Sequence, residues 1–130
     1  MIWRLAPHVK PIEATLAAEA QAWCKMIISR NPTIVNRGPA ARILSETTQQ
    51  DCLLVRAVMY FQTWEWPQSG SGWGDYYFRV VEMTFVNDAK SAERVLDEHR
   101  IHVTEYEDES FDWQAALAEF SKPFEQEQRG

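Results

Sequence analysis

The sequence predicts an α+β fold of the ferredoxin-like βαββαβ type, with an antiparallel sheet, a long aromatic hairpin and an additional C-terminal amphipathic helix. Three observations lead to this prediction. Residues 11–32 and 110–124 carry apolar side chains at helical spacing, residues 52–66 and 75–87 are rich in β-branched and aromatic residues, and a glycine-rich turn separates the last two segments.

The length and composition indicate one globular domain. The chain has 130 residues, of which 45% are apolar and 25% are charged. We therefore expect a single domain over residues 1–130. Within it, residues 31–51 form an insertion or a short helix, and residues 105–130 form an acidic C-terminal segment.

The first elements in this arrangement are a short strand over residues 2–5 and a helix over residues 11–32. Pro11 suits the first turn of the helix, because its missing N–H has no partner there. Asn31-Pro32 ends the helix, since proline disfavours the α conformation of the residue before it. The apolar stripe of this helix consists of Ile12, Leu16, Ala20, Trp23 and Ile27. Residues 33–39 then predict a loop, and residues 40–50 (AARILSETTQQ) are compatible with a short helix.

The hairpin consists of strands over residues 52–66 and 75–87, joined by the turn PQSGSGWG. Side chains alternate across a strand, so parity assigns them to two faces. The expected core face carries Leu53, Val55, Ala57, Met59, Phe61, Val81, Met83 and Phe85. The opposite face is polar near Arg56 and Glu82 and aromatic toward the turn.

Two further elements complete the expected fold and lead to its C-terminal helix. Residues 88–100 (DAKSAERVLDEHR) predict a helix with Asp88 as its N-cap, and residues 101–106 predict a strand. Ser110 is expected to cap the last helix. The apolar side chains of that helix are Trp113, Leu117, Phe120 and Phe124.

The aromatic face of the hairpin is too large to remain bare in water, because each tyrosine or tryptophan buries roughly 150–250 Å². It is covered by the final helix, by a second copy of the chain, or by another protein. Tryptophan and tyrosine are typical anchors of protein interfaces. The candidate partner-binding residues are Tyr60, Trp64, Trp66, Trp73, Tyr76 and Phe78 of the hairpin, with Glu105, Glu107, Asp108 and Glu109 of the acidic segment.

The net charge of −6 lies at the end of the chain. Residues 1–104 hold eleven acidic and eleven basic side chains, whereas residues 105–130 hold eight acidic and two basic ones. An acidic segment repels nucleic acid and anionic lipid but attracts a basic protein. We therefore expect neither nucleic-acid nor membrane binding.

The sequence contains no motif for catalysis, metal binding or phosphate binding. No HExxH, P-loop or EF-hand pattern occurs, and the glycine loop is explained as a hairpin turn. Cys24 and Cys52 have no CxxC spacing, so we expect reduced thiols rather than a disulfide. We accordingly predict no catalytic residue, metal or cofactor. With no run of 18 apolar residues and no apolar leader, the expected compartment is the cytoplasm.

These observations favour a non-catalytic intracellular protein-binding module, similar in composition to small acidic inhibitor and immunity-type proteins. It would contact its partner through the aromatic hairpin and the acidic C-terminal segment. The alternative hypothesis is a dimeric ferredoxin-like small-ligand binder or enzyme. Its pocket would be lined by aromatic residues, with His8, His99 or His102 as the polar group.

Overall fold

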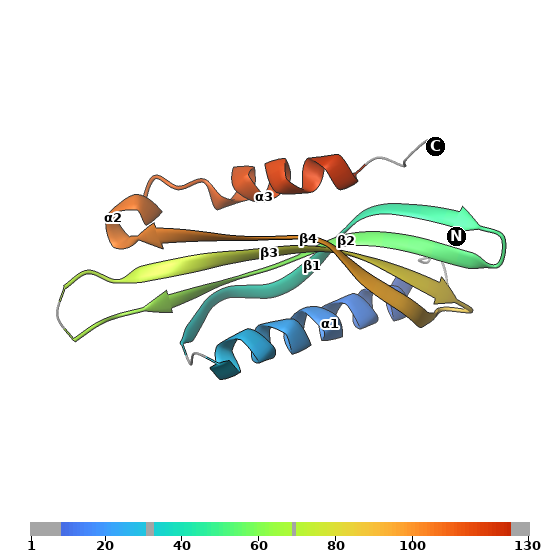
Figure 1. The fold of residues 1–130 in the computed structure, drawn as a ribbon, viewed down its shortest axis with the longest axis horizontal. Coiled ribbons are helices and arrows are strands. Elements are labelled where there is room, and N and C mark those ends of the chain that lie inside the picture. Colours follow the sequence, from blue (N-terminus) through green and yellow to red (C-terminus); the bar gives the residue numbers. More distant parts are fainter. Residues whose placement is uncertain (1–8, 31–32, 69, 126–130) are drawn as a thin grey trace, which may run out of the picture.

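The computed structural model describes residues 9–30, 33–68 and 70–125. A four-stranded antiparallel sheet lies between helix α1 on one face and helix α3 on the other (Figure 1). The elements are α1 (Val9–Arg30), β1 (Ile34–Gln49), β2 (Cys52–Glu65), β3 (Trp73–Val86), β4 (Ala89–Thr104), α2 (Glu105–Asp108), α3 (Trp113–Ser121) and the 3-10 helix η1 (Lys122–Phe124). The predicted α+β character is therefore confirmed.

The ferredoxin-like prediction is wrong, because the sheet is a simple meander. The strands lie in the order β1-β2-β3-β4, and each pairs antiparallel with the next one along the chain. The described residues contain no helix between two strands, whereas a βαββαβ fold requires two. The strand expected over residues 2–5 lies outside the described residues.

Residues 89–100 are a strand rather than the expected helix. Asn87 and Asp88 have φ values of 53° and 66°, and Val86 pairs with Ala89 across them. Positive φ at both central residues is the type I′ turn that joins two antiparallel strands. Asp88 therefore lies in the turn between β3 and β4 instead of capping a helix. The helix propensity of the following residues is overridden, because β4 completes the hydrogen bonding of β3.

Residues 40–50 also form a strand where a short helix was expected. They belong to β1, which pairs with β2 from Ile34 opposite Trp64 to Gln49 opposite Cys52. The pairing is irregular near Gly38, whose φ is 78°. A Cβ atom at Gly38 would lie 2.7 Å from the carbonyl oxygen of Tyr60, so only glycine permits this close approach.

The two faces of the central hairpin are sorted as parity predicts. Val55 lies opposite Met83, and Arg56 lies opposite Glu82. The odd-numbered residues of β2 and β3 pack against α1. This first core consists of Ile12, Leu16, Ala20, Trp23, Cys24, Val55, Ala57, Met59, Phe61, Val81, Met83 and Phe85.

The two predicted amphipathic helices are present with slightly different bounds. The N-terminal helix buries the expected stripe of apolar side chains against the sheet. The C-terminal helix begins at Trp113, because the carboxylate of Asp112 rather than Ser110 accepts the capping hydrogen bond, from the N–H of Ala115 at 3.0 Å. The segment 101–106 remains a strand only to Thr104, since Glu105 begins α2.

Candidate binding surface at the hairpin end of the sheet

Most of the aromatic face of the hairpin is covered by the chain's own α3. The exposed fractions of Trp64, Tyr76 and Phe78 are 8%, 2% and 1%. The ring of Phe78 lies 5.8 Å from that of Phe120, and the ring of Tyr60 lies 5.6 Å from that of Trp113. The sequence allowed three ways to cover the aromatic face, and in the structure the chain's own final helix covers it. Trp64, Tyr76 and Phe78 are thus core residues of a second cluster, between the sheet and α3.

Large apolar side chains remain exposed at the end of the sheet that carries the β2–β3 loop. Trp66 is 60% exposed, Ile34 is 61% exposed, and Trp73 is half-buried. A hollow of about 340 Å³ lies between them. Its lining residues are Thr33, Ile34, Trp64, Glu65, Trp66, Pro67 and Trp73. The sequence predicted the two tryptophans but placed Ile34 in an ordinary loop.

Two glycines of the loop and of β3 allow the tryptophans to pack closely. A Cβ atom at Gly74 would lie 2.4 Å from Cε3 of Trp64, and one at Gly72 would lie 2.7 Å from Nε1 of Trp64 and 2.8 Å from Cε3 of Trp66. With no Cβ in the way, the rings of Trp64 and Trp66 reach a centroid distance of 5.6 Å. The glycine-rich turn therefore positions the tryptophans, besides reversing the chain.

The acidic helix α2 lies at this same end (Figure 1). The backbone N–H of Glu105 donates to the carbonyl of Gly72 at 2.9 Å, which attaches α2 to the β2–β3 loop. Thr104 and Glu107 form a capping box at the start of α2. The pKa of Glu107 lies below its usual range, mainly because its carboxylate accepts a hydrogen bond from the backbone N–H of Thr104. Tyr106 in the middle of α2 is 79% exposed.

A polar network beneath α2 fixes its last turn. The hydroxyl of Tyr76 donates to Oδ1 of Asp108 at 2.8 Å, and Nε2 of Gln62 approaches the same oxygen at 3.5 Å. Gln62 is buried within the sheet and also accepts from Nδ2 of Asn36 at 3.3 Å. Asp108 is therefore held from below, so its carboxylate serves mainly to anchor the helix.

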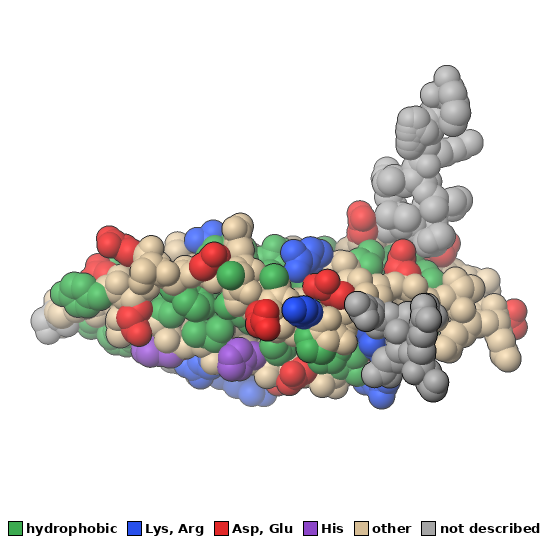
Figure 2. Space-filling model, turned by 90° about the horizontal axis from the view of Figure 1, so that it is seen from above, with side chains coloured by type: hydrophobic (Ala, Val, Ile, Leu, Met, Phe, Trp, Pro, Cys, Tyr) green, Lys and Arg blue, Asp and Glu red, His purple; other side chains and the backbone are tan. Residues whose placement is uncertain are grey.

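These residues form what we call the hairpin-end surface, where apolar and acidic side chains lie side by side (Figure 2, left end). Its members are Ile34, Trp66, Trp73, Glu105, Tyr106, Glu107 and Glu109. The hairpin-end surface contains five of the ten partner-binding residues that were predicted from the sequence. Of the other five, Trp64, Tyr76 and Phe78 are core residues, Tyr60 packs under Trp113, and Asp108 anchors α2. Tyr106 was not among the predicted partner-binding residues, because its acidic neighbours in the sequence indicated a solvated segment.

The histidines do not gather into one site. His99 lies on the α3 face of β4, where its ring stacks on Phe120 at 6.0 Å. His102 lies on the opposite face, with Nδ1 3.0 Å from Oδ1 of Asp75. Asp75 also accepts from Nη2 of Arg100 at 3.1 Å. His8 lies outside the described residues.

The cysteines are both free thiols. Cys24, on α1, packs in the core between that helix and the sheet, and burial raises the pKa of its thiol. Cys52 is half-buried at the start of β2. Over residues 9–30, 33–68 and 70–125, no three side chains of His, Cys, Asp or Glu are grouped to hold a metal ion.

Fold and surface define the chain as a sheet-and-helix domain of three layers, built on a four-stranded meander with one helix on each face. Comparison with models of protein families, with curated proteins and with solved structures finds no match. In the part of the chain that the structure describes, no helix is both long enough and apolar enough to cross a membrane.

Proposed function

We propose that the protein is a non-catalytic binding module that captures a basic protein partner with the hairpin-end surface. The observation that carries the proposal is the exposure of Trp66, Tyr106 and Ile34, each at least 60% exposed, at the end of the sheet that carries the acidic helix α2. Exposed aromatic side chains of this size are costly in water and are typical anchors of protein interfaces.

The charges of α2 support a basic partner in particular. Glu105, Glu107 and Glu109 are acidic, and the first two lie in the first turn of the helix. Carboxylates beside an aromatic anchor attract a cationic surface and raise the rate of encounter, an effect that salt weakens. Binding through this surface is therefore expected to be fast at low salt and slower at high salt.

The attachment of the surface to the core also supports the proposal. The loop of Gly72 is bonded to α2, and α2 is bonded through Asp108 to the central strand. A surface held in this way loses little conformational freedom when a partner docks, so more of the contact energy remains for affinity.

The experiment compares capture of proteins from a cell extract by the wild type and by the double variant Trp66→Ala/Tyr106→Ala. The matched control is Val95→Ala, an exposed apolar residue of β4, 46% exposed and outside the hairpin-end surface. A protein retained by the wild type and by the control, but lost from the double variant and at high salt, supports the proposal. Retention by all three proteins contradicts it.

Light scattering on the same three proteins tests whether the partner is a second copy of the chain. A wild-type dimer that becomes a monomer in Trp66→Ala/Tyr106→Ala would assign the hairpin-end surface to self-association and overturn the proposal. A monomer in every case leaves the surface available for a different protein.

A further inference from the structure

The second unusual site lies on the α3 face of the sheet, at the end opposite to the hairpin-end surface. A row of polar side chains crosses all four strands there, since Ser45 lies opposite Arg56, Arg56 opposite Glu82, and Glu82 opposite Arg94. On β2 and β3 the next row toward the centre of the sheet consists of Val58 and Val80, both fully buried. The change from apolar to polar marks the limit of the α3 cover.

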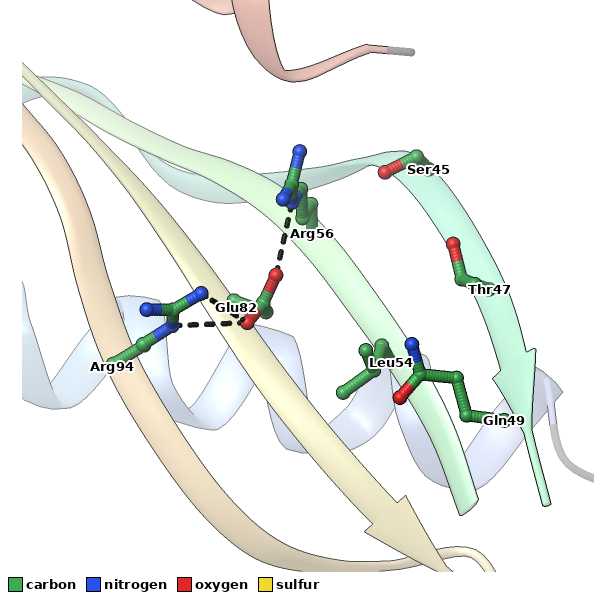
Figure 3. A pocket seen from close by; sticks show the side chains of 7 residues that line it. All are labelled: Ser45, Thr47, Gln49, Leu54, Arg56, Glu82 and Arg94. Atoms are coloured by element: carbon green, nitrogen blue, oxygen red, sulfur yellow. Dashed lines mark hydrogen bonds and ion pairs between the residues drawn. The ribbon is translucent and has the colours of Figure 1, made fainter. Parts of the chain in front are cut away.

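The two arginines share one carboxylate (Figure 3). Nε of Arg56 donates to Oε2 of Glu82 at 3.0 Å, while Nε and Nη2 of Arg94 lie 3.0 and 2.9 Å from Oε1. Burial alone would raise the pKa of Glu82, but the hydrogen bonds and charges of the two arginines outweigh it and lower that pKa. The group of three therefore carries one net positive charge, and both oxygens of the carboxylate are occupied.

The site retains hydrogen-bond donors without acceptors. A guanidinium has five N–H groups, and Arg56 uses only the one on Nε. Among the described residues, neither Nη atom of Arg56, the hydroxyl of Thr47 nor the side-chain amide of Gln49 has a hydrogen-bond partner. The side chain of Arg56 is only 15% exposed, so its Nη atoms are partly withdrawn from bulk water, whereas Gln49 is exposed at the mouth of the site.

A hollow of about 250 Å³ receives these donors. It is lined by Ser45, Thr47, Gln49, Leu54, Arg56, Glu82 and Arg94 (Figure 3). This volume is below the roughly 300–1,000 Å³ of pockets that enclose drug-sized ligands, so the hollow suits a group of few heavy atoms. Only Leu54 contributes an apolar side chain to it.

We propose that this hollow binds a small oxyanion, a phosphate or carboxylate group, between the guanidinium of Arg56 and the polar side chains of β1. An excess of donors, a net positive charge and a small polar volume are what such a group requires. Arg94 holds the carboxylate of Glu82 on its far side and so keeps that carboxylate from folding over the Nη atoms of Arg56. The site is independent of the hairpin-end surface and of its partner.

The test is a titration of the full chain with inorganic phosphate at constant ionic strength, followed by the backbone amide signals of residues 45–56 in nuclear magnetic resonance spectra. We expect saturable shifts in the wild type. Arg56→Gln should weaken binding by about tenfold or more, and Arg94→Gln by about threefold, as expected for loss of hydrogen bonds to a charged group.

The matched control is Arg79→Gln. Arg79 also pairs with a glutamate, Glu98, and its side chain is 17% exposed, but it lies on the α1 face, over the ring of Trp23. Phosphate binding should be unchanged in this variant. If Arg79→Gln weakens binding as much as Arg56→Gln, or if the wild type shows no saturable shift, the proposal is wrong.

Two additions keep the test decisive. Thr47→Val leaves the pair of Arg56 and Glu82 intact, so it reports on the site even if Arg56→Gln fails to fold, and about threefold weaker binding is expected. A parallel titration with acetate distinguishes the source of the oxyanion. Tighter binding of acetate assigns a carboxylate ligand, and tighter binding of phosphate assigns a phosphoryl group.

Discussion

The hydroxyl of Tyr76, on the central strand β3, donates a hydrogen bond of 2.8 Å to Oδ1 of Asp108 at the end of α2. This contact joins the interior of the sheet to the acidic surface above it. Tyr76 is only 2% exposed, and its ring also contacts Phe111 at a centroid distance of 5.0 Å. The position of α2 therefore depends on a side chain whose own protonation state is fixed by burial.

The first prediction concerns the ionisation of Tyr76. Burial, followed by the hydrogen bond and charge of Asp108, raises the pKa of Tyr76 to about 12. An alkaline titration monitored by tyrosinate absorbance should show a component near pH 12 that is absent from Tyr76→Phe. Persistence of that component in the variant would contradict the assignment.

The same shift predicts an alkaline loss of stability. The pKa of Tyr76 is higher in the folded than in the unfolded chain, where it is about 10. The unfolded chain therefore loses this proton first, and the stabilisation, complete below about pH 10, disappears as the pH rises toward 12. Urea unfolding at several alkaline pH values should show a steeper decline for the wild type than for Tyr76→Phe.

A second pH effect is expected in acid, at Glu82. The two arginines lower the pKa of Glu82 in the folded chain, so its contribution to stability is present above the unfolded pKa of about 4.3. It is lost as the pH falls through the folded pKa. Glu82→Gln should be less stable than the wild type at neutral pH, and the difference should shrink in acid. Glu46→Gln, at an exposed glutamate of β1, controls for the loss of one negative charge.

Gly74 is predicted to tolerate no larger residue. A Cβ atom there would lie 2.4 Å from Cε3 of Trp64 and 2.6 Å from the carbonyl oxygen of Thr63. Gly74→Ala should lower the free energy of unfolding by about 1–3 kcal/mol or more, because the backbone and the indole must both move. Ser71→Ala, in the adjoining loop, should change it by no more than about 0.5 kcal/mol. Chemical denaturation of the two variants measures this difference.

Trp64 and Trp66 are two residues apart yet should respond differently to truncation. Trp64 is 8% exposed and Trp66 is 60% exposed. Trp64→Ala should cost about 3–5 kcal/mol of stability, as expected for a buried aromatic residue. Trp66→Ala should cost less than about 1 kcal/mol. Equal losses in thermal or urea unfolding would mean that Trp66 belongs to the core, and the hairpin-end surface would lose its anchor.

The parts of the fold that could be predicted are those with a one-sided apolar pattern. The stripe from Ile12 to Trp23 defines α1 because one face of it enters the core. The alternation in β2 and β3 fixes their register for the same reason. The hairpin-end surface was predicted in part, because parity separates the two faces of a strand but does not show how far a distant helix such as α3 reaches.

The predictions that were wrong concern the edge strands β1 and β4, which have little apolar pattern of their own. Between Ala89 and Arg100 every residue of β4 except Leu96 is exposed, so nothing in the sequence forces a period of two. Its strand conformation comes from pairing with β3. The available signal was Asn87-Asp88, since both residue types tolerate positive φ and favour a tight hairpin turn. Gln50, with a φ of 48°, gave no comparable signal before β2.

The order of the strands has a consequence for how the chain folds. Because every strand pairs with its neighbour along the chain, the sheet can grow by one hairpin at a time, with no distant segment threaded between two others. Such short-range pairing lowers the entropic barrier to folding relative to a sheet with crossovers. Each core also needs a helix from one end of the chain, α1 on one face and α3 on the other, so strand pairing alone completes neither.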